Sequence, residues 1–160
     1  MFILFFLALT GIFTLGEIVL KKKYKQKDIV NILLKYLLVI NIGLAGIWAF
    51  IGHAFFADMV AAKIGWPIGS PFQFEVAMAN LAFGTLGILC LWFRKEFWWA
   101  TAIASGIFLF GDGVGHVRQA IINNNFAPYN TGVILFSDLL MPILIIFLMI
   151  ANSKLNKKIS

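Results

Sequence analysis

Five apolar runs, each close to the length that a helix needs to cross the hydrocarbon core of a membrane, dominate this sequence. About 20 consecutive apolar residues are enough for one crossing. The runs lie at about residues 2–20, 30–53, 74–93, 97–118 and 131–151. With 61% hydrophobic and only 12% charged residues, the composition lies outside that of soluble domains. The sequence therefore predicts an all-α fold, a polytopic membrane bundle of five transmembrane helices that forms a single membrane domain over residues 1–160.

Lysine and arginine are shared unequally between the loops, and this predicts the orientation of the bundle. If the first run starts outside, eleven of the thirteen basic residues fall on the cytoplasmic side, and only Lys63 and Arg118 fall on the outer side. Cytoplasmic loops carry the excess of Lys and Arg, so we expect the amino terminus outside and the carboxyl terminus in the cytoplasm. The formal charge of +6 then reflects topology in a multi-pass protein of the cell membrane. The lipid bilayer is the expected partner, and nucleic acid is not.

An acid and a histidine lie one helical turn apart in the fourth run, within the glycine-rich string from Gly111 to His116. Ionisable groups are costly at membrane depth and mark candidate functional sites. Offsets of four, seven and eleven residues return to nearly the same helix face. The stripe that results contains Thr101, Ser105, Asp112, His116 and Gln119. We expect it to face the bundle interior or a wet cavity, and the glycines to serve either close helix packing or the approach of a ligand.

Other polar residues fall in the same leaflet under this orientation. His53 ends the second run, Asp58 follows it, Glu75 opens the third run, and Asp138 lies about two turns into the fifth. Asn80 also lies on the third run, but Glu75 points about 140° away from it around the helix. Glu75 and Asn80 can face the same polar cluster only if this helix starts later or bends.

Carboxylates and imidazoles are the ligands that iron, manganese and zinc take in proteins. One hypothesis is therefore a transition metal ion held by Asp112, His116 and Asp138, and then by His53 and Glu75. Such a site would serve redox or hydrolytic chemistry in the outer leaflet. The sequence leaves open whether the chain is an enzyme, and it identifies no catalytic residue.

Three other interpretations of the same residues stay open. The acids could carry protons or cations through a small transporter or channel, and His53 with His116 could hold a haem between two imidazoles. In a purely structural network, Arg118 would neutralise Asp112. The remaining members of the polar site are Asp58, Asn80, Ser105, Arg118 and Gln119. The chain could also pack as an accessory subunit of a membrane complex, or as a homo-oligomer.

The segment between the second and third runs combines a helical start with a rigid end. Residues from His53 to Ile64 can continue as a short helix that Gly65 stops. The two prolines after Gly65 exclude regular helix up to Gln73. This segment is expected to be either an interfacial cap or a lid over the polar cluster.

Three strings carry a resemblance to a known group: Gly52-His53-Ala54-Phe55-Phe56-Ala57-Asp58, the stretch from Ile64 to Glu75, and Gly111 to His116. Together they resemble an uncharacterised family of small bacterial and archaeal integral membrane proteins, over about residues 43–150. This resemblance implies a membrane bundle without a known activity. The hairpin layout, with an acid early in one span and a basic turn after it, is also similar to the DoxX-like membrane proteins, which implies a redox-linked accessory role.

Overall fold

A computed structural model describes residues 2–157, which form helices and turns and contain no strand. In chain order the elements are α1 (Phe2–Leu20), α2 (Gln26–Tyr36), η1 (Leu37–Leu44), α3 (Ala45–Phe55), α4 (Ala57–Ile64), α5 (Phe72–Leu89), α6 (Glu96–Asn123), α7 (Pro128–Thr131) and α8 (Val133–Lys157). Within the described residues, five helical stretches are long and apolar enough to cross a membrane. The all-α class and the five membrane-length helices are thus confirmed, while the orientation of the termini stays a prediction.

The helices differ from the expected spans mainly at their ends. α5 ends at Leu89 instead of near residue 93, because Trp92 and Phe93 belong to the turn into α6 although both are aromatic. α6 continues to Asn123, beyond the expected end near residue 118, since Arg118 and its polar neighbours keep helical backbone bonds. Hydropathy reports apolarity and not backbone hydrogen bonding, so it includes apolar turn residues and misses polar helix ends.

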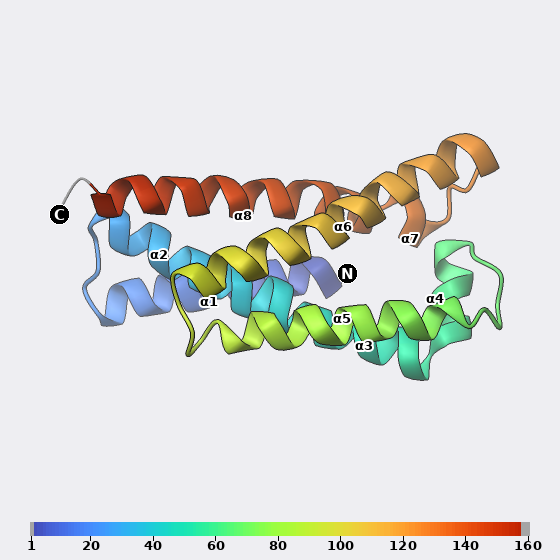
Figure 1. The fold of residues 1–160 in the computed structure, drawn as a ribbon, viewed down its shortest axis with the longest axis horizontal. Helices are drawn as coiled ribbons and strands as arrows, with labels where there is room; N and C mark the ends of the chain where they lie inside the picture. The colour runs from blue at the N-terminus through green and yellow to red at the C-terminus, as the bar shows by residue number, and fades with distance from the viewer. Residues whose placement is uncertain (1, 158–160) are drawn as a thin grey trace.

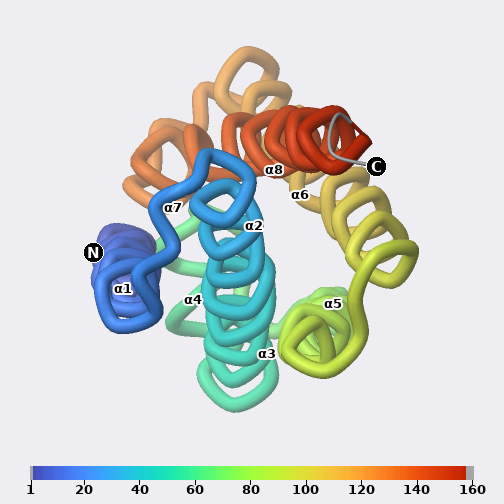
Figure 2. Tube along the Cα trace, turned by 90° about the vertical axis from the view of Figure 1, so that its left-hand side faces the viewer, coloured from blue at the N-terminus to red at the C-terminus, as the bar shows by residue number. Residues whose placement is uncertain are grey.

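The second membrane-length stretch is not one continuous α-helix. Between α2 and α3, the eight residues of η1 adopt the wider π-helical turn, and six of them are buried. Asn41 within η1 donates from Nδ2 to Oγ1 of Thr10 on α1, over 2.6 Å. Figure 2 shows this stretch crossing the middle of the bundle, with α1 on one side and α5 and α6 on the other. η1 is therefore the contact point between α1 and the rest of the molecule at this level.

Four glycines bring this stretch against α5. A Cβ atom added to Gly87 would lie 2.4 Å from the backbone nitrogen of Gly43, and one added to Gly46 would lie 2.9 Å from Cα of Gly84. Helices of membrane proteins approach this closely only where small residues face each other. At these glycines, the backbone of η1 and α3 therefore packs directly against the backbone of α5.

The apolar core lies toward one end of the bundle, which holds the α1–α2 turn, the α5–α6 turn and the end of α8 (Figure 1). We call it the basic end, because the lysines from Lys21 to Lys25 lie in the α1–α2 turn. Leu34 and Leu38 from the second stretch, Trp98 from α6 and Ile145 from α8 are almost completely buried there. Close packing of these large side chains leaves the basic end filled.

One half-buried carboxylate ties α1 to α2 at the basic end. Glu17 accepts hydrogen bonds from Lys35, from the Tyr36 hydroxyl at 2.7 Å and from Lys21 at 2.9 Å. Lys35 is itself buried, with its ammonium group over the Tyr36 ring. These contacts compensate the charge of Glu17, which would be costly if it were alone.

From the basic end, α5 and α6 diverge toward the opposite end, where α4 and α7 lie (Figure 1). We call this second end the α4–α7 end. α3 runs beside α5, and α8 runs beside α6, so that the bundle has two arms. The space between the arms holds the polar residues that the sequence singled out.

Candidate functional site

A cavity of about 950 Å³ lies between the two arms, and residues from all five membrane-length stretches line it. This volume is at the upper end of the range for small-molecule sites. The lining includes eight of the ten residues predicted for the polar site: His53, Asn80, Ser105, Asp112, His116, Arg118, Gln119 and Asp138. The polar stripe of α6 therefore faces an internal space, as its helical phase indicated.

His116 is held in one orientation by Asn130, which is completely buried. The amide nitrogen of Asn130 donates to the carbonyl oxygens of His116, at 3.1 Å, and of Asn125, at 2.7 Å. The oxygen Oδ1 of Asn130 therefore faces Nδ1 of His116, at 2.8 Å. If the Asn130 amide were rotated by 180°, its oxygen would face the two carbonyl oxygens, and no hydrogen bond could form there. Nδ1 of His116 must carry a hydrogen to donate this bond. The other ring nitrogen, Nε2, takes no part in this bond.

Nε2 of His116 faces the carboxylate of Asp138 on α8. It lies 3.7 Å from Oδ2 of Asp138, an ion-pair separation longer than a hydrogen bond, and both residues are buried. A deprotonated Nε2 and a carboxylate both present lone pairs, so this pair offers a place for one proton. Asp112 also lines the cavity. The wall of the cavity thus combines one imidazole–carboxylate pair with a second carboxylate.

The glycines around Asp112 have separate roles. A Cβ atom at Gly113 would lie 2.6 Å from Cδ2 of Leu139, so Gly113 permits the close approach of α6 and α8 that sets His116 beside Asp138. At Gly111 and Gly115, a Cβ atom would have nothing within 4 Å, and both residues line the cavity. Gly113 therefore serves close helix packing, whereas the approach of a ligand at Gly111 and Gly115 stays a prediction.

The second histidine is also oriented by an amide. Nδ1 of His53, near the end of α3, lies 2.5 Å from Oε1 of Gln73 at the start of α5. Gln73 is buried, and its Nε2 has no hydrogen-bond partner among the described residues. His53 lines the cavity from the arm opposite to His116. Each arm therefore contributes one imidazole with Nδ1 bound to an amide group.

Two loops meet beside the cavity at the α4–α7 end, and we call their contact the roof. Gly65 ends α4 in the left-handed conformation, with φ of 80°, as the sequence indicated. Asn125, after α6, donates from Nδ2 to the carbonyl of Ile64 over 2.9 Å. Because the carbonyl of Asn125 also accepts from Asn130, the roof and His116 share one hydrogen-bond chain.

Three predicted residues lie away from the centre of the cluster. Glu75 is exposed and does not line the cavity, since it is two positions from the buried Gln73 and therefore on the opposite side of α5. Asp58 is exposed as well, and its Oδ1 accepts a bond from the backbone of the loop after α4 at 3.0 Å. Arg118 is exposed at the cavity edge. It lies about 120° around α6 from Asp112, and among the described residues it forms no ion pair with that acid.

The transition metal site proposed from the sequence is not supported by this geometry. Within residues 2–157, no group of three or more His, Cys, Asp and Glu side chains is placed to hold a metal ion. Zinc sites in proteins use at least three protein ligands. Glu75 points away and His53 is bound to Gln73 on the other arm, which leaves His116 and Asp138 as the pair in contact.

Asn130 is the residue of the site that the sequence pattern did not identify. It belongs to a polar loop that reads as an ordinary turn, yet it makes three hydrogen bonds in the interior. The one available signal was the density of asparagines between Asn123 and Asn130, because amide side chains can satisfy backbone groups that a folded-back loop leaves unpaired. The spacing of these asparagines along the sequence did not predict that one of them would bind His116.

Comparison with known proteins agrees with the expected membership of an uncharacterised family. No curated protein and no solved structure matched the chain. The similarity to DoxX-like proteins therefore stays a prediction. The model of a family of unknown function, DUF6790, matches residues 1–158. The chain belongs to this family, whose function its description leaves open.

Proposed function

We propose that this chain is a small multi-pass membrane carrier that binds a monovalent organic cation in the cavity and exchanges it for the proton held by His116 and Asp138. The observation that carries the proposal is the position of this pair. It forms part of the wall of a large cavity between helices of membrane length, beside a second carboxylate. Intramembrane acids and histidines are retained mainly on the paths of ions, protons and substrates.

The charges in the cavity wall favour a cation. With one shared proton the pair of His116 and Asp138 is neutral, and the carboxylate of Asp112 leaves one net negative charge in the interior. No cationic side chain among the described residues forms an ion pair with Asp112. In a low-dielectric interior, an uncompensated carboxylate attracts a cation far more strongly than it would in water.

The exchange keeps the charge of the site constant. When a monovalent cation binds between Asp112 and Asp138, the proton of the pair is repelled and leaves from Nε2 of His116. The interior then holds two carboxylates, a neutral imidazole and the bound cation, which again sum to one negative charge. One cation is exchanged for one proton. Binding of the cation is therefore expected to strengthen as the pH rises.

The fold supports access from alternate sides. The basic end is filled by the apolar core, whereas at the α4–α7 end Asn125 donates hydrogen bonds to the α4 loop. By the positive-inside rule, the excess of lysine at the basic end supports a cytoplasmic location for that end, with the roof facing outward. Because the Asn130 amide joins the roof to His116, protonation of the pair and opening of the roof are expected to be coupled.

The test is cation-driven proton movement in proteoliposomes. Vesicles loaded with a pH-sensitive dye receive an inward gradient of tetramethylammonium, and the internal pH is followed. We expect the wild type to raise the internal pH, since protons leave as the cation enters. The Asp138→Asn variant should lose this response, and Asp28→Asn, an acid-to-amide change in α2 outside the cavity, should retain it.

Two results would contradict the carrier proposal. One is a wild-type rate equal to that of protein-free vesicles at saturating tetramethylammonium. The other is an equal rate in Asp138→Asn and the wild type. Folding of each variant is checked by helical circular dichroism and by elution as a single species in gel filtration, so that loss of exchange is not confused with loss of structure.

A further inference from the structure

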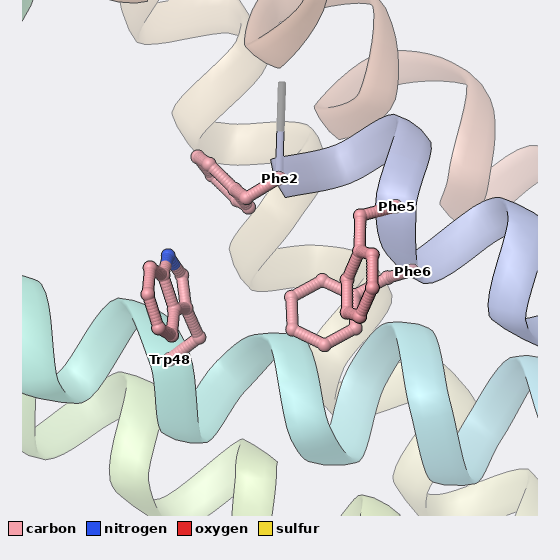
Figure 3. A pocket seen from close by; sticks show the side chains of 4 residues that line it. All are labelled: Phe2, Phe5, Phe6 and Trp48. Carbon is pink, nitrogen blue, oxygen red and sulfur yellow. The ribbon is translucent and has the colours of Figure 1, made fainter.

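A second, apolar pocket of about 280 Å³ lies between α1 and α3, lined by Phe2, Phe5, Phe6 and Trp48. Figure 3 shows the rings of Phe5 and Phe6 directed from α1 toward the second stretch, while Trp48 rises from α3 toward Phe2. Phe5 and Trp48 are exposed at the surface of the bundle, whereas Phe6 is buried. In a membrane this pocket would be reached from the lipid side.

The pocket adjoins the large cavity. Phe2 and Trp48 line both spaces, so these two aromatic side chains lie between the two. The combined space has an aromatic end without ionisable groups and a polar end with Asp112 and Asp138. This is the shape and polarity of an amphipathic molecule with one charged head and one short apolar chain.

The polar end selects the sign of the head group. Lys63 and Arg118 also line the cavity, but both are exposed, and the ammonium of Lys63 lies over the Tyr129 ring near the roof. Asp138 is buried and Asp112 is half-buried, so their charges are less screened by solvent than those of the two cations. Aromatic rings such as Trp48 add attraction for a cation through their faces.

We propose that the pocket between α1 and α3 receives the alkyl chain of an amphipathic ammonium ion whose head group lies in the cavity beside Asp112 and Asp138. This inference rests on the carrier function proposed above and narrows its substrate to alkylammonium ions. The chain enters between Phe2 and Trp48, and the four rings remove its methylenes from water. The exposed side of the pocket gives such a molecule a path between the site and the lipid.

The test compares binding of two ammonium ions by calorimetry with the full chain in lipid nanodiscs, and subtracts the heat measured with empty nanodiscs. Ethyltrimethylammonium and hexyltrimethylammonium have the same head group and differ by four methylenes. Each methylene moved from water to an apolar site strengthens binding by about fourfold, so we expect hexyltrimethylammonium to bind the wild type at least roughly tenfold more tightly. Hexyl sulfate, with the same chain and opposite charge, should not compete.

Two variants separate the pocket from general membrane partitioning. Phe5 lines the pocket but not the large cavity, and it is exposed, so Phe5→Ala is expected to fold normally. In this variant the advantage of the hexyl chain should fall to about threefold or less, with binding of ethyltrimethylammonium unchanged. Phe147→Ala removes an equally exposed ring of α8 that lines neither space, and it should behave as the wild type.

Each outcome has a defined meaning. An equal hexyl advantage in the wild type, Phe5→Ala and empty nanodiscs would refute the chain site. Competition by hexyl sulfate would refute the charge assignment. Loss of ethyltrimethylammonium binding in Asp112→Asn, with no loss in Phe5→Ala, supports the division between head and chain. The wild type could also bind both ions with the expected difference but move no protons in vesicles. That result would support this binding site and refute only the carrier function.

Discussion

Asn130 is the residue whose replacement by alanine tests the arrangement of the site most directly. Its side chain makes three buried hydrogen bonds, two as donor to the carbonyls of His116 and Asn125 and one as acceptor from Nδ1 of His116. At about 1 kcal/mol each, as in soluble proteins, their loss would cost about 3 kcal/mol. At the average of about 0.6 kcal/mol found between membrane helices, it would cost about 2 kcal/mol. We therefore expect Asn130→Ala to lower the free energy of unfolding by about 2 to 3 kcal/mol.

The imidazole provides a second, independent readout. The chain has only two histidines, so nitrogen NMR of protein labelled at histidine gives two ring systems, and His116→Gln assigns them. In the neutral wild type, His116 should carry its hydrogen on Nδ1. In Asn130→Ala it should become a mixture of the two tautomers, because the acceptor that selects Nδ1 is gone.

Asn123→Ala is the matched control for both measurements. Asn123 is exposed at the end of α6, and its amide donates one bond, to Gln119 at 2.6 Å. This variant should change the free energy of unfolding by less than about 0.5 kcal/mol and leave the tautomer of His116 unaltered. If Asn130→Ala behaves in the same way as this control, Asn130 does not orient His116. The assignment of Nε2 as the atom that exchanges the proton would then be wrong as well.

Two further predictions concern the scaffold. Gly87→Ala should destabilise the protein by about 2 kcal/mol or more, since its Cβ would lie 2.4 Å from facing backbone, and this overlap outweighs the gain of about 1 kcal/mol in helix propensity. Gly11→Ala, which meets nothing within 4 Å, should be neutral or stabilising, and equal unfolding curves for the two variants would contradict the close contact. Lys35→Met should cost about 2 to 3 kcal/mol, because it removes the buried partner of Glu17 while other donors remain. Lys21→Met, at an exposed position, should cost less than about 1 kcal/mol, and a larger loss there than at Lys35 would reverse the assigned roles.

Apolar length and helical phase were sufficient to predict the helices and one wall of the cavity. The five membrane-length stretches follow from hydropathy because a helix satisfies its backbone bonds within itself, whatever its neighbours are. Phase alone placed Ser105, Asp112 and His116 on one side of α6, and it also showed that Glu75 and Asn80 point in different directions. Each of these inferences depends on the residues of a single helix and not on how two helices pack.

Features that depend on two elements were beyond the sequence pattern. Asp138 meets His116 because Gly113 lets α6 and α8 come close, and Asn130 reaches His116 because the loop after α6 folds back. Neutralisation of Asp112 by Arg118, which one of the open interpretations invoked, is not formed among the described residues, because residues six positions apart lie on different faces of a helix. The metal hypothesis depended on convergence of residues from several helices, for which a single sequence contains no direct signal.

The π-helical segment η1 sets the rotation of the second half of the second membrane-length stretch relative to the first half. Lys35, before it, is directed to the ion pair at the basic end, and His53, beyond it, is directed to the cavity. Conversion of all eight residues of η1 to ordinary α-helix, without any deletion, would rotate everything after it relative to α2, because each residue of the wider π-helical turn advances around the axis by less than the about 100° of an α-helix. His53 would leave the cavity and the Gly46 contact would be lost, while Glu17 would keep Lys35. The backbone conformation of this short segment, whose Asn41 and Ile42 also line the cavity, thus sets which face of α3 the cavity receives.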